Sequence, residues 1–239
     1  HVEYIHGGVS RNVVEDIANI ELRPTFVGIV DDSALGEDVV KKLKNHKVNT
    51  DYVMTMPGGM GTWLAVFDHN GDLAGSISQR PNLMPILGLL EKKGDEIFAN
   101  ADSVIVEVDM DKDIIKKVVT LAKQYNKKLY GVVSNMSIAV ERRDFLKHFD
   151  CFICNQLEAG MLFMEDYADK SPEELRDILS KRVILGKIPA MIVTMGGNGA
   201  VYADVNGEKG ICPPQRVRVK DTTGAGDAFC AGVASGLTY

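Results

Sequence analysis

The sequence predicts an α/β fold, in which helices cover both faces of a mostly parallel sheet and a small antiparallel sheet, here called the lid, lies apart from it. Apolar strand-like runs alternate with amphipathic helical patterns from about residue 95, which is typical of a covered parallel sheet. Two short strand-like runs, 62–67 and 73–77, flank Asn70-Gly71, a strong hairpin signal. A glycine-broken polar loop at 220–226 leads directly into a helix of small apolar residues.

The composition fits one sizeable core with a small appendage. The chain has 239 residues, of which 45% are hydrophobic and 25% charged. A net charge of −6 without a long basic run argues against nucleic acid as the main partner. No apolar run approaches the roughly 18 residues of a membrane-spanning helix, and HVEYIHGG does not resemble a signal peptide. We therefore expect no membrane partner.

Cys151 and Cys154 form a C-x-x-C pattern, which can indicate redox or zinc chemistry. No second pair follows at metal spacing, and the segment reads as an apolar strand. We therefore expect buried thiols, since free cysteine is among the most buried residue types. Reduced cysteines favour a cytoplasmic location.

The N-terminal third of the chain contains short elements of both kinds. Residues 1–6 alternate loosely, like a strand, and would join the hairpin in the lid. Trp63 on this lid is expected to pack within it rather than stack on a ligand. The predicted domains are an α/β core at 7–50 and 79–239, and a β lid at 1–6 and 51–78. The expected core elements of this third are a helix from about 11, a strand at 26–30 and a helix at 36–46; a further strand at 52–56 lies in the lid range.

The remaining chain shows the strand–helix alternation of a parallel sheet. A capping box at Ser171 and Glu174, with Pro172 between them, marks a helix start. Ligands of such sheets lie at the carboxyl ends of strands, so the loops after 154 and 194 are candidate sites. The expected strands are 103–108, 129–133, 151–154, 190–194 and 200–203, and the expected helices are 111–125, 137–147 and 172–182.

The segment KDTTGAGDAFCAGVASG carries the clearest chemical signal. Gly224 and Gly226 let the backbone turn tightly, and the helix that follows offers unpaired N–H groups, so the loop suits a phosphate. Asp227 inside this loop could take the proton from a hydroxyl while a phosphoryl group arrives. The plainer interpretation is a turn followed by an ordinary first-turn acid.

DTTGAGDAFCAG closely resembles the C-terminal signature of the PfkB/ribokinase family of carbohydrate and nucleoside kinases. The resemblance extends over essentially the whole chain and implies a ribokinase-like fold. It implies ATP-dependent phosphorylation of a hydroxyl on a small sugar or nucleoside. It also implies that Gly224, Ala225 and Gly226 form an anion hole and that Asp227 is the general base.

GGVSRN resembles the sugar-binding GG-x-x-x-N element of this family, with matches at Gly7, Gly8 and Asn12. Arg11 beside this Asn is similar to the pseudouridine-kinase branch. From the pattern alone, a double glycine between a strand and a helix is equally typical of a sharp turn.

Two further motifs follow expected strands. Asn155 and Glu158 match the family's N-x-x-E near metal and phosphates, where Glu158 would act on Mg²⁺ through water. Thr194, Gly196 and Gly199 match its T-x-G-x-x-G nucleotide loop. A helix cap and a hairpin turn are the structural alternatives.

Other implications of the resemblance concern cations, assembly and chain ends. Asp221 matches a position that some members use near a monovalent cation such as K⁺. A homodimer through the lid is compatible with the family pattern. Family members usually begin with one more strand and continue beyond the catalytic helix, so the pattern extends past both ends of this sequence.

Two other function classes compete with a kinase. A nicotinamide-dependent oxidoreductase would need G-x-G-x-x-G, but the nearest match, from Gly224, has Phe229 in place of the third glycine. A non-catalytic protein that binds a nucleoside or nucleotide would use the same loops. The retention of Asp227, Asn155 and Glu158 favours the enzyme.

Overall fold

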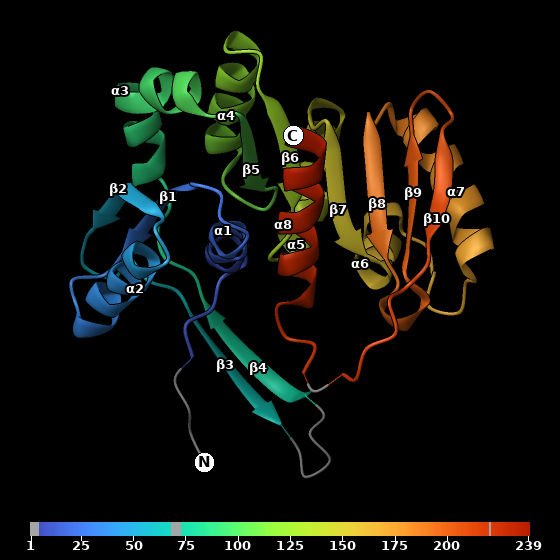
Figure 1. The fold of residues 1–239 in the computed structure, drawn as a ribbon, viewed down its shortest axis with the longest axis horizontal. Helices are drawn as coiled ribbons and strands as arrows, with labels where there is room; N and C mark the ends of the chain where they lie inside the picture. The colour runs from blue at the N-terminus through green and yellow to red at the C-terminus, as the bar shows by residue number, and fades with distance from the viewer. Residues whose placement is uncertain (1–4, 68–72, 220) are drawn as a thin grey trace.

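A computed structural model describes residues 5–67, 73–219 and 221–239. A six-stranded sheet forms its centre, in the order β10-β9-β8-β7-β6-β5 (Figure 1). Neighbouring strands from β5 to β8 are parallel, whereas β9 and β10 are antiparallel additions at one side. The strands are β5 (Ser103–Glu107), β6 (Lys128–Val132), β7 (Cys151–Asn155), β8 (Ala190–Thr194), β9 (Ala200–Asp204) and β10 (Lys209–Cys212).

Helices cover both faces of this sheet because its strands are apolar on both sides. Along β6, Leu129 belongs to the core under one helical layer, whereas Tyr130 and Val132 belong to the core under the other. The first layer comprises α3 (Pro85–Asn100), α4 (Lys112–Gln124), α5 (Met136–Ala139), the 3₁₀ helix η1 (Val140–His148), α6 (Gln156–Phe163) and α7 (Pro172–Gly186). The second comprises α1 (Val9–Asn19) and α8 (Ala225–Thr238).

Two smaller sheets lie beside the central one. β1 (Thr25–Val30) and β2 (Asn49–Thr55) are parallel and pack with α2 (Ala34–Asn45), while β3 (Thr62–Phe67) and β4 (Leu73–Gln79) form an antiparallel hairpin. The expected small antiparallel sheet is therefore confirmed. β2 lies in the range assigned to the lid but pairs with a strand of the range assigned to the core. The division into core and lid remains a prediction.

Some expectations for the lid need correction or lie outside the description. Ile5 and His6 belong to no strand, and residues 1–4 lie outside the described ranges. The expected turn at Asn70-Gly71 lies outside them as well. Trp63 is 60% exposed, so its expected packing within the lid is wrong.

The other differences are local. The helix expected over 137–147 is one α-helical turn followed by the 3₁₀ helix η1. The helix α3 was not among the expected helices. Cys151 and Cys154 are buried as expected. In the part of the chain that the structure describes, every helix is too short or too polar to cross a bilayer.

Candidate functional site

The carboxyl ends of the parallel strands lie along one edge of the central sheet, and α8 begins at the same edge (Figure 1). Asn155 and Thr194 are register partners where β7 and β8 end. The Thr194 hydroxyl is 3.5 Å from the carbonyl oxygen of Cys154. Two motifs 39 positions apart (155 and 194) thus lie side by side on neighbouring strands.

The glycines of two loops hold backbone conformations that other residues resist. Gly224 has φ of +77° and is the residue from which α8 starts. Within the described residues no side chain caps this helix. The Ala225 N–H donates to the Thr222 carbonyl oxygen at 3.1 Å, whereas the N–H groups of Gly226 and Asp227 have no partner among the described residues and are available to a ligand. Gly199 has φ of +87°, and a Cβ there would lie 2.2 Å from the carbonyl oxygen of Cys212. The loop after β8 therefore depends on glycine at this position.

Asn12 and Asp227 meet although they are 215 positions apart. The Asn12 side-chain amide donates a hydrogen bond of 2.6 Å from Nδ2 to Oδ2 of Asp227. Packing of α1 against α8 produces this contact, with Val13, Cys230 and Ala231 in their shared core. The predicted acceptor-binding amide and the predicted base are thus in direct contact.

The electrostatics of Asp227 combine opposing effects. Burial raises the pKa of its carboxyl above the usual value, and the negative charge of Asp16 raises it further. The hydrogen bond from Asn12 and the positive charge of Arg11 oppose this rise in pKa. A carboxylate with a raised pKa is a stronger base than an exposed one.

Asn155 and Glu158 form a capping box at the start of α6. The Asn155 side-chain oxygen accepts from the Glu158 N–H at 2.9 Å, and the Glu158 carboxylate accepts from the Asn155 N–H at 2.8 Å. The structural alternative, a helix cap, is thus present, but the surroundings of the Glu158 carboxylate differ from those of a cap at the protein surface. Burial raises the pKa of its carboxyl, and the negative charges of Asp227 and Asp109 raise it further.

The negative charges around Glu158 bear on whether Mg²⁺ fits the site. Glu158 has carboxylate oxygens, which Mg²⁺ prefers, and two further carboxylates near enough to raise its pKa. A divalent cation would relieve that repulsion, so Glu158 fits a role as a ligand that acts through water. Within the described ranges, no group of three or more His, Cys, Asp or Glu side chains could hold a metal. A site here would thus take most of its ligands from water and phosphate.

Sequence reasoning missed an acidic pair where β5 ends. Asp109 is fully buried and accepts hydrogen bonds from Arg80 at 2.8 Å and from the Ser134 N–H at 2.9 Å. Glu107 accepts from the Ser10 N–H at 3.0 Å, and burial raises the pKa of its carboxyl. The signal in the sequence was available, because SVIVEVD places two acids at the end of an apolar strand.

Other predicted residues take no part in these contacts. Asp221 is exposed, and its carboxylate accepts from the Thr223 N–H at 2.8 Å, which lowers the pKa of its carboxyl. Gly7 lies in an exposed coil, and Gly8, with φ of +106°, is the residue from which α1 starts. Their predicted contacts with an acceptor remain predictions.

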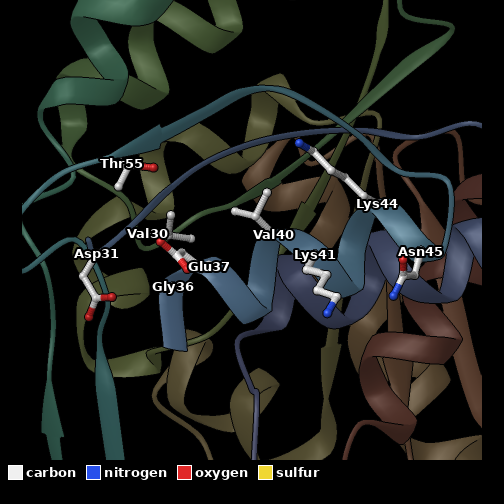
Figure 2. Close-up of a pocket in the computed structure, with 9 residues that line it drawn as sticks. All are labelled: Val30, Asp31, Gly36, Glu37, Val40, Lys41, Lys44, Asn45 and Thr55. Carbon is white, nitrogen blue, oxygen red and sulfur yellow. The ribbon is translucent and has the colours of Figure 1, made fainter. Parts of the chain in front are cut away.

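Two surface hollows lie away from the predicted site residues. The first, of about 460 Å³, separates α2 from the ends of β1 and β2; Figure 2 shows Val30, Asp31 and Thr55 on its strand side. Gly36 on its helix side leaves no room for a Cβ, which would lie 2.2 Å from the Asp31 carbonyl oxygen. The second, of about 510 Å³, lies between β1 and β5. The lining of neither hollow includes Asn12 or Asp227.

Comparison with solved structures defines the class of fold. The ribokinase of Arabidopsis thaliana, complexed with ribose and ATP, superimposes with a TM-score of 0.80 at 20% identity, covering 97% of this chain and 74% of that one. The adenosine kinase of Sinorhizobium meliloti gives a TM-score of 0.78 at 21% identity, covering 97% and 71%. The protein has a ribokinase-like α/β fold, as predicted.

Comparison of sequences shows the family to which the chain belongs. The profile described as pfkB family carbohydrate kinase matches residues 1–239, and the chain belongs to this family. The guanosine-inosine kinase of Exiguobacterium acetylicum is 32% identical over 241 residues, covering 99% of this chain and 78% of that protein. The pseudouridine kinase of Escherichia coli K12 is 24% identical over 245 residues, covering 98% and 74%.

Proposed function

We propose that this protein transfers the γ-phosphoryl group of ATP to a hydroxyl of a small sugar or nucleoside. The observation that carries the proposal is the contact of 2.6 Å between Asn12 and Asp227 beside the uncapped start of α8. An amide that can bind an acceptor and a carboxylate that can take its proton lie together at a place suited to phosphate.

Asp227 is the general base in this proposal. Its carboxylate accepts the hydroxyl proton as the acceptor oxygen forms its bond to the γ-phosphorus and the bond to the departing ADP breaks. The raised pKa of the Asp227 carboxyl supports this role, because a more basic carboxylate accepts the proton more readily.

The N–H groups at the start of α8 are the proposed anion hole. Its proposed donors are the N–H groups of Gly224, Ala225 and Gly226, of which that of Ala225 would exchange the Thr222 carbonyl oxygen for the phosphate. Such donors stabilise charge on a transferring phosphoryl group. Thr194, Gly196 and Gly199 are the proposed nucleotide loop, with Asn155 beside it. Glu158 would hold Mg²⁺ through water, and the cation would neutralise charge on the phosphate oxygens.

Two relatives support a proposal for the class of acceptor molecule. The two curated relatives described above are a guanosine-inosine kinase and a pseudouridine kinase, so we place nucleosides ahead of free sugars. Gly7, Gly8 and Asn12 are the proposed acceptor-binding residues.

A K⁺ ion near Asp221 is a further proposal, which the dependence of turnover on added KCl or NaCl would test.

We also propose a homodimer through the β3–β4 hairpin. Leu64, Val66 and Ile77 lie on one face of this hairpin and are 51%, 55% and 71% exposed, and exposed apolar side chains on one face are typical of an interaction surface. Sedimentation measurements on the wild type and on Ile77→Lys would test it. An unchanged mass would contradict the role of this surface.

The activity test uses Mg·ATP with a panel of guanosine, inosine, pseudouridine, ribose and fructose, and measures ADP formed above background. Asp227→Asn should lower turnover at least about 10²-fold, while ATP still protects the variant against heat. Wild-type turnover in that variant would reject Asp227 as base. ATP binding without transfer to any acceptor would favour a non-catalytic nucleotide-binding protein.

A further inference from the structure

Arg11 contacts both Asn12 of the proposed acceptor site and Glu15, the charged residue one turn further along α1. Its Nη2 donates to Oδ1 of Asn12 at 2.7 Å, and its Nη1 donates to Oε2 of Glu15 at 2.6 Å. The other oxygen of Glu15 lies 3.3 Å from Nε2 of His46 on the segment after α2. A continuous series of polar contacts thus runs from His46 through Glu15, Arg11 and Asn12 to Asp227.

This series fixes which way the Asn12 amide faces. A guanidinium can only donate hydrogen bonds, so the group of Asn12 that meets Arg11 must be the carbonyl oxygen. An ionised carboxylate can only accept, so the group that meets Asp227 must be the NH₂. Both neighbours require the same orientation, and rotation of the amide by 180° would place like groups opposite each other at both ends.

We propose that Arg11 is a positioning residue for the proposed phosphoryl transfer, locking the Asn12 amide so that it presents only N–H donors to Asp227 and to the acceptor. One N–H is used by Asp227, and the other has no hydrogen-bond partner among the described residues, so it can donate to the acceptor molecule. The atom of the substrate that meets Asn12 must then be an oxygen or nitrogen that can accept a hydrogen bond. This inference rests on the proposed function and deepens it.

The burial of Arg11 supports a role beyond a surface ion pair. Its side chain is 16% exposed and that of Glu15 is 25% exposed, so this i,i+4 pair is largely shielded from water. The Nε atom is buried and has no hydrogen-bond partner within the described residues. An unsatisfied buried donor costs free energy, so stability alone does not explain a guanidinium at this position.

Several charges face Asp227, and the test must separate Arg11 from them. From α1 these are Arg11, whose positive charge lowers the pKa of the Asp227 carboxyl, and Asp16, whose negative charge raises it. Glu158 faces it from α6, and Cys230 lies on α8 itself. Removal of the Arg11 charge should therefore move the titration of Asp227 to higher pH.

The experiment compares Arg11→Gln and Arg11→Lys with the wild type, using the acceptor that the panel identifies. Arg11→Gln should lower kcat/KM for the acceptor about 10- to 100-fold, since small errors in position cost this much, and leave the KM for ATP nearly unchanged. Its acidic limb of kcat/KM should move to higher pH. Arg11→Lys retains the charge but not the two-pronged geometry, so it should lose rate while the acidic limb stays in place.

Arg176→Gln is the matched control, because Arg176 also pairs with a carboxylate, at 2.9 Å from Asp177. It lies on α7, which packs on the other face of the central sheet from α1. It should change none of these parameters. An Arg11→Gln enzyme with a lower Tm but wild-type kcat, KM and pH profile would overturn the inference. If Arg11→Gln does not fold, an unchanged kcat/KM in Arg11→Lys would overturn it instead.

The two proposals fail in different ways. A wild type that binds ATP but transfers nothing to any acceptor rejects the proposed function, and the inference with it. A wild type that turns over while the Arg11 variants match it rejects the inference alone.

Discussion

At the scale of single residues, the same burial that makes Asp227 basic should also make it destabilising. Its carboxyl has a folded-state pKa above the ordinary value of 3.8, so ionisation is harder in the folded protein than in the unfolded chain. Below pH 3.8 the carboxyl is protonated in both states, and the folded protein has the full stability that the protonated group allows. This stability is lost as the pH rises through the folded pKa. Near neutral pH the protein carries this cost permanently.

Asp227→Asn should remove that cost while its side-chain oxygen still accepts from Asn12. We expect the difference in unfolding free energy, variant minus wild type, to increase as the pH rises from about 3.5 and to level off above the folded pKa. Urea unfolding between pH 3.5 and 8 measures it. Asp51→Asn, at an exposed position on β2, is the control and should give a smaller pH dependence. A difference for Asp227→Asn that decreases with pH would contradict the raised pKa.

At the scale of elements, α6 and α7 begin with the same device but differ in their surroundings. Asn155 with Glu158 and Ser171 with Glu174 both form complete capping boxes. Around Glu158, burial and neighbouring carboxylates raise the pKa of the carboxyl, whereas Glu174 has a lowered pKa because of its bonds to Ser171. The first box thus lies in a charged site and the second serves only its helix.

Glutamine also completes a capping box, so Glu158→Gln and Glu174→Gln form a matched pair. We expect Glu158→Gln to lower Mg²⁺-dependent turnover by about 10- to 100-fold, as outer-sphere metal partners typically do, without loss of thermal stability. Glu174→Gln should keep wild-type turnover. A titration of turnover against MgCl₂ for both variants checks this, and equal losses in the two would indicate a helix effect instead of a metal effect.

Elements with clear local signals could be predicted from the sequence. The strands at 62–67 and 190–194 match the predicted bounds because apolar runs end there at polar residues or glycine. The helix α3 was missed because Gly88 and Gly94 weaken its helical pattern. Gly94 has a packing reason, since a Cβ there would lie 2.5 Å from a methyl group of Leu121 on α4. Tertiary packing, which a local pattern does not contain, thus stabilises α3.

In the candidate site, too, local sequence patterns predict the motifs but not the contacts that tertiary packing creates. The glycine loops and Asp227 could be picked out because each motif is short and continuous. The contact between Asn12 and Asp227 joins residues 215 positions apart, and the orientation of the Asn12 amide depends on Arg11 as well. Such contacts arise from the packing of α1 on α8, so the sequence pattern named the participants but not their hydrogen bonds.

At the scale of the whole molecule, an ion pair between Arg80 and Asp109 joins the hairpin arm to the central sheet. Arg80 follows β4, and Asp109 follows β5; their side chains are 31% and 0% exposed. Asp109 also accepts from the Ser134 N–H, which links the same carboxylate to the loop after β6. Loss of Arg80 would leave a buried carboxylate with this single described hydrogen bond.

We therefore expect Arg80→Leu to destabilise the protein by up to about 3–5 kcal/mol, the usual cost of an uncompensated buried charge. The double variant Arg80→Leu/Asp109→Asn should be more stable than Arg80→Leu alone, because the remaining group is then neutral. Lys93→Met is the control: the side chains of Lys93 and Glu96 are 53% and 50% exposed, so loss of this ion pair should change stability much less. Urea unfolding at pH 7 measures all three. If the double variant is no more stable than Arg80→Leu, the cost lies in lost packing of the Arg80 side chain, and the ion pair does not anchor the arm.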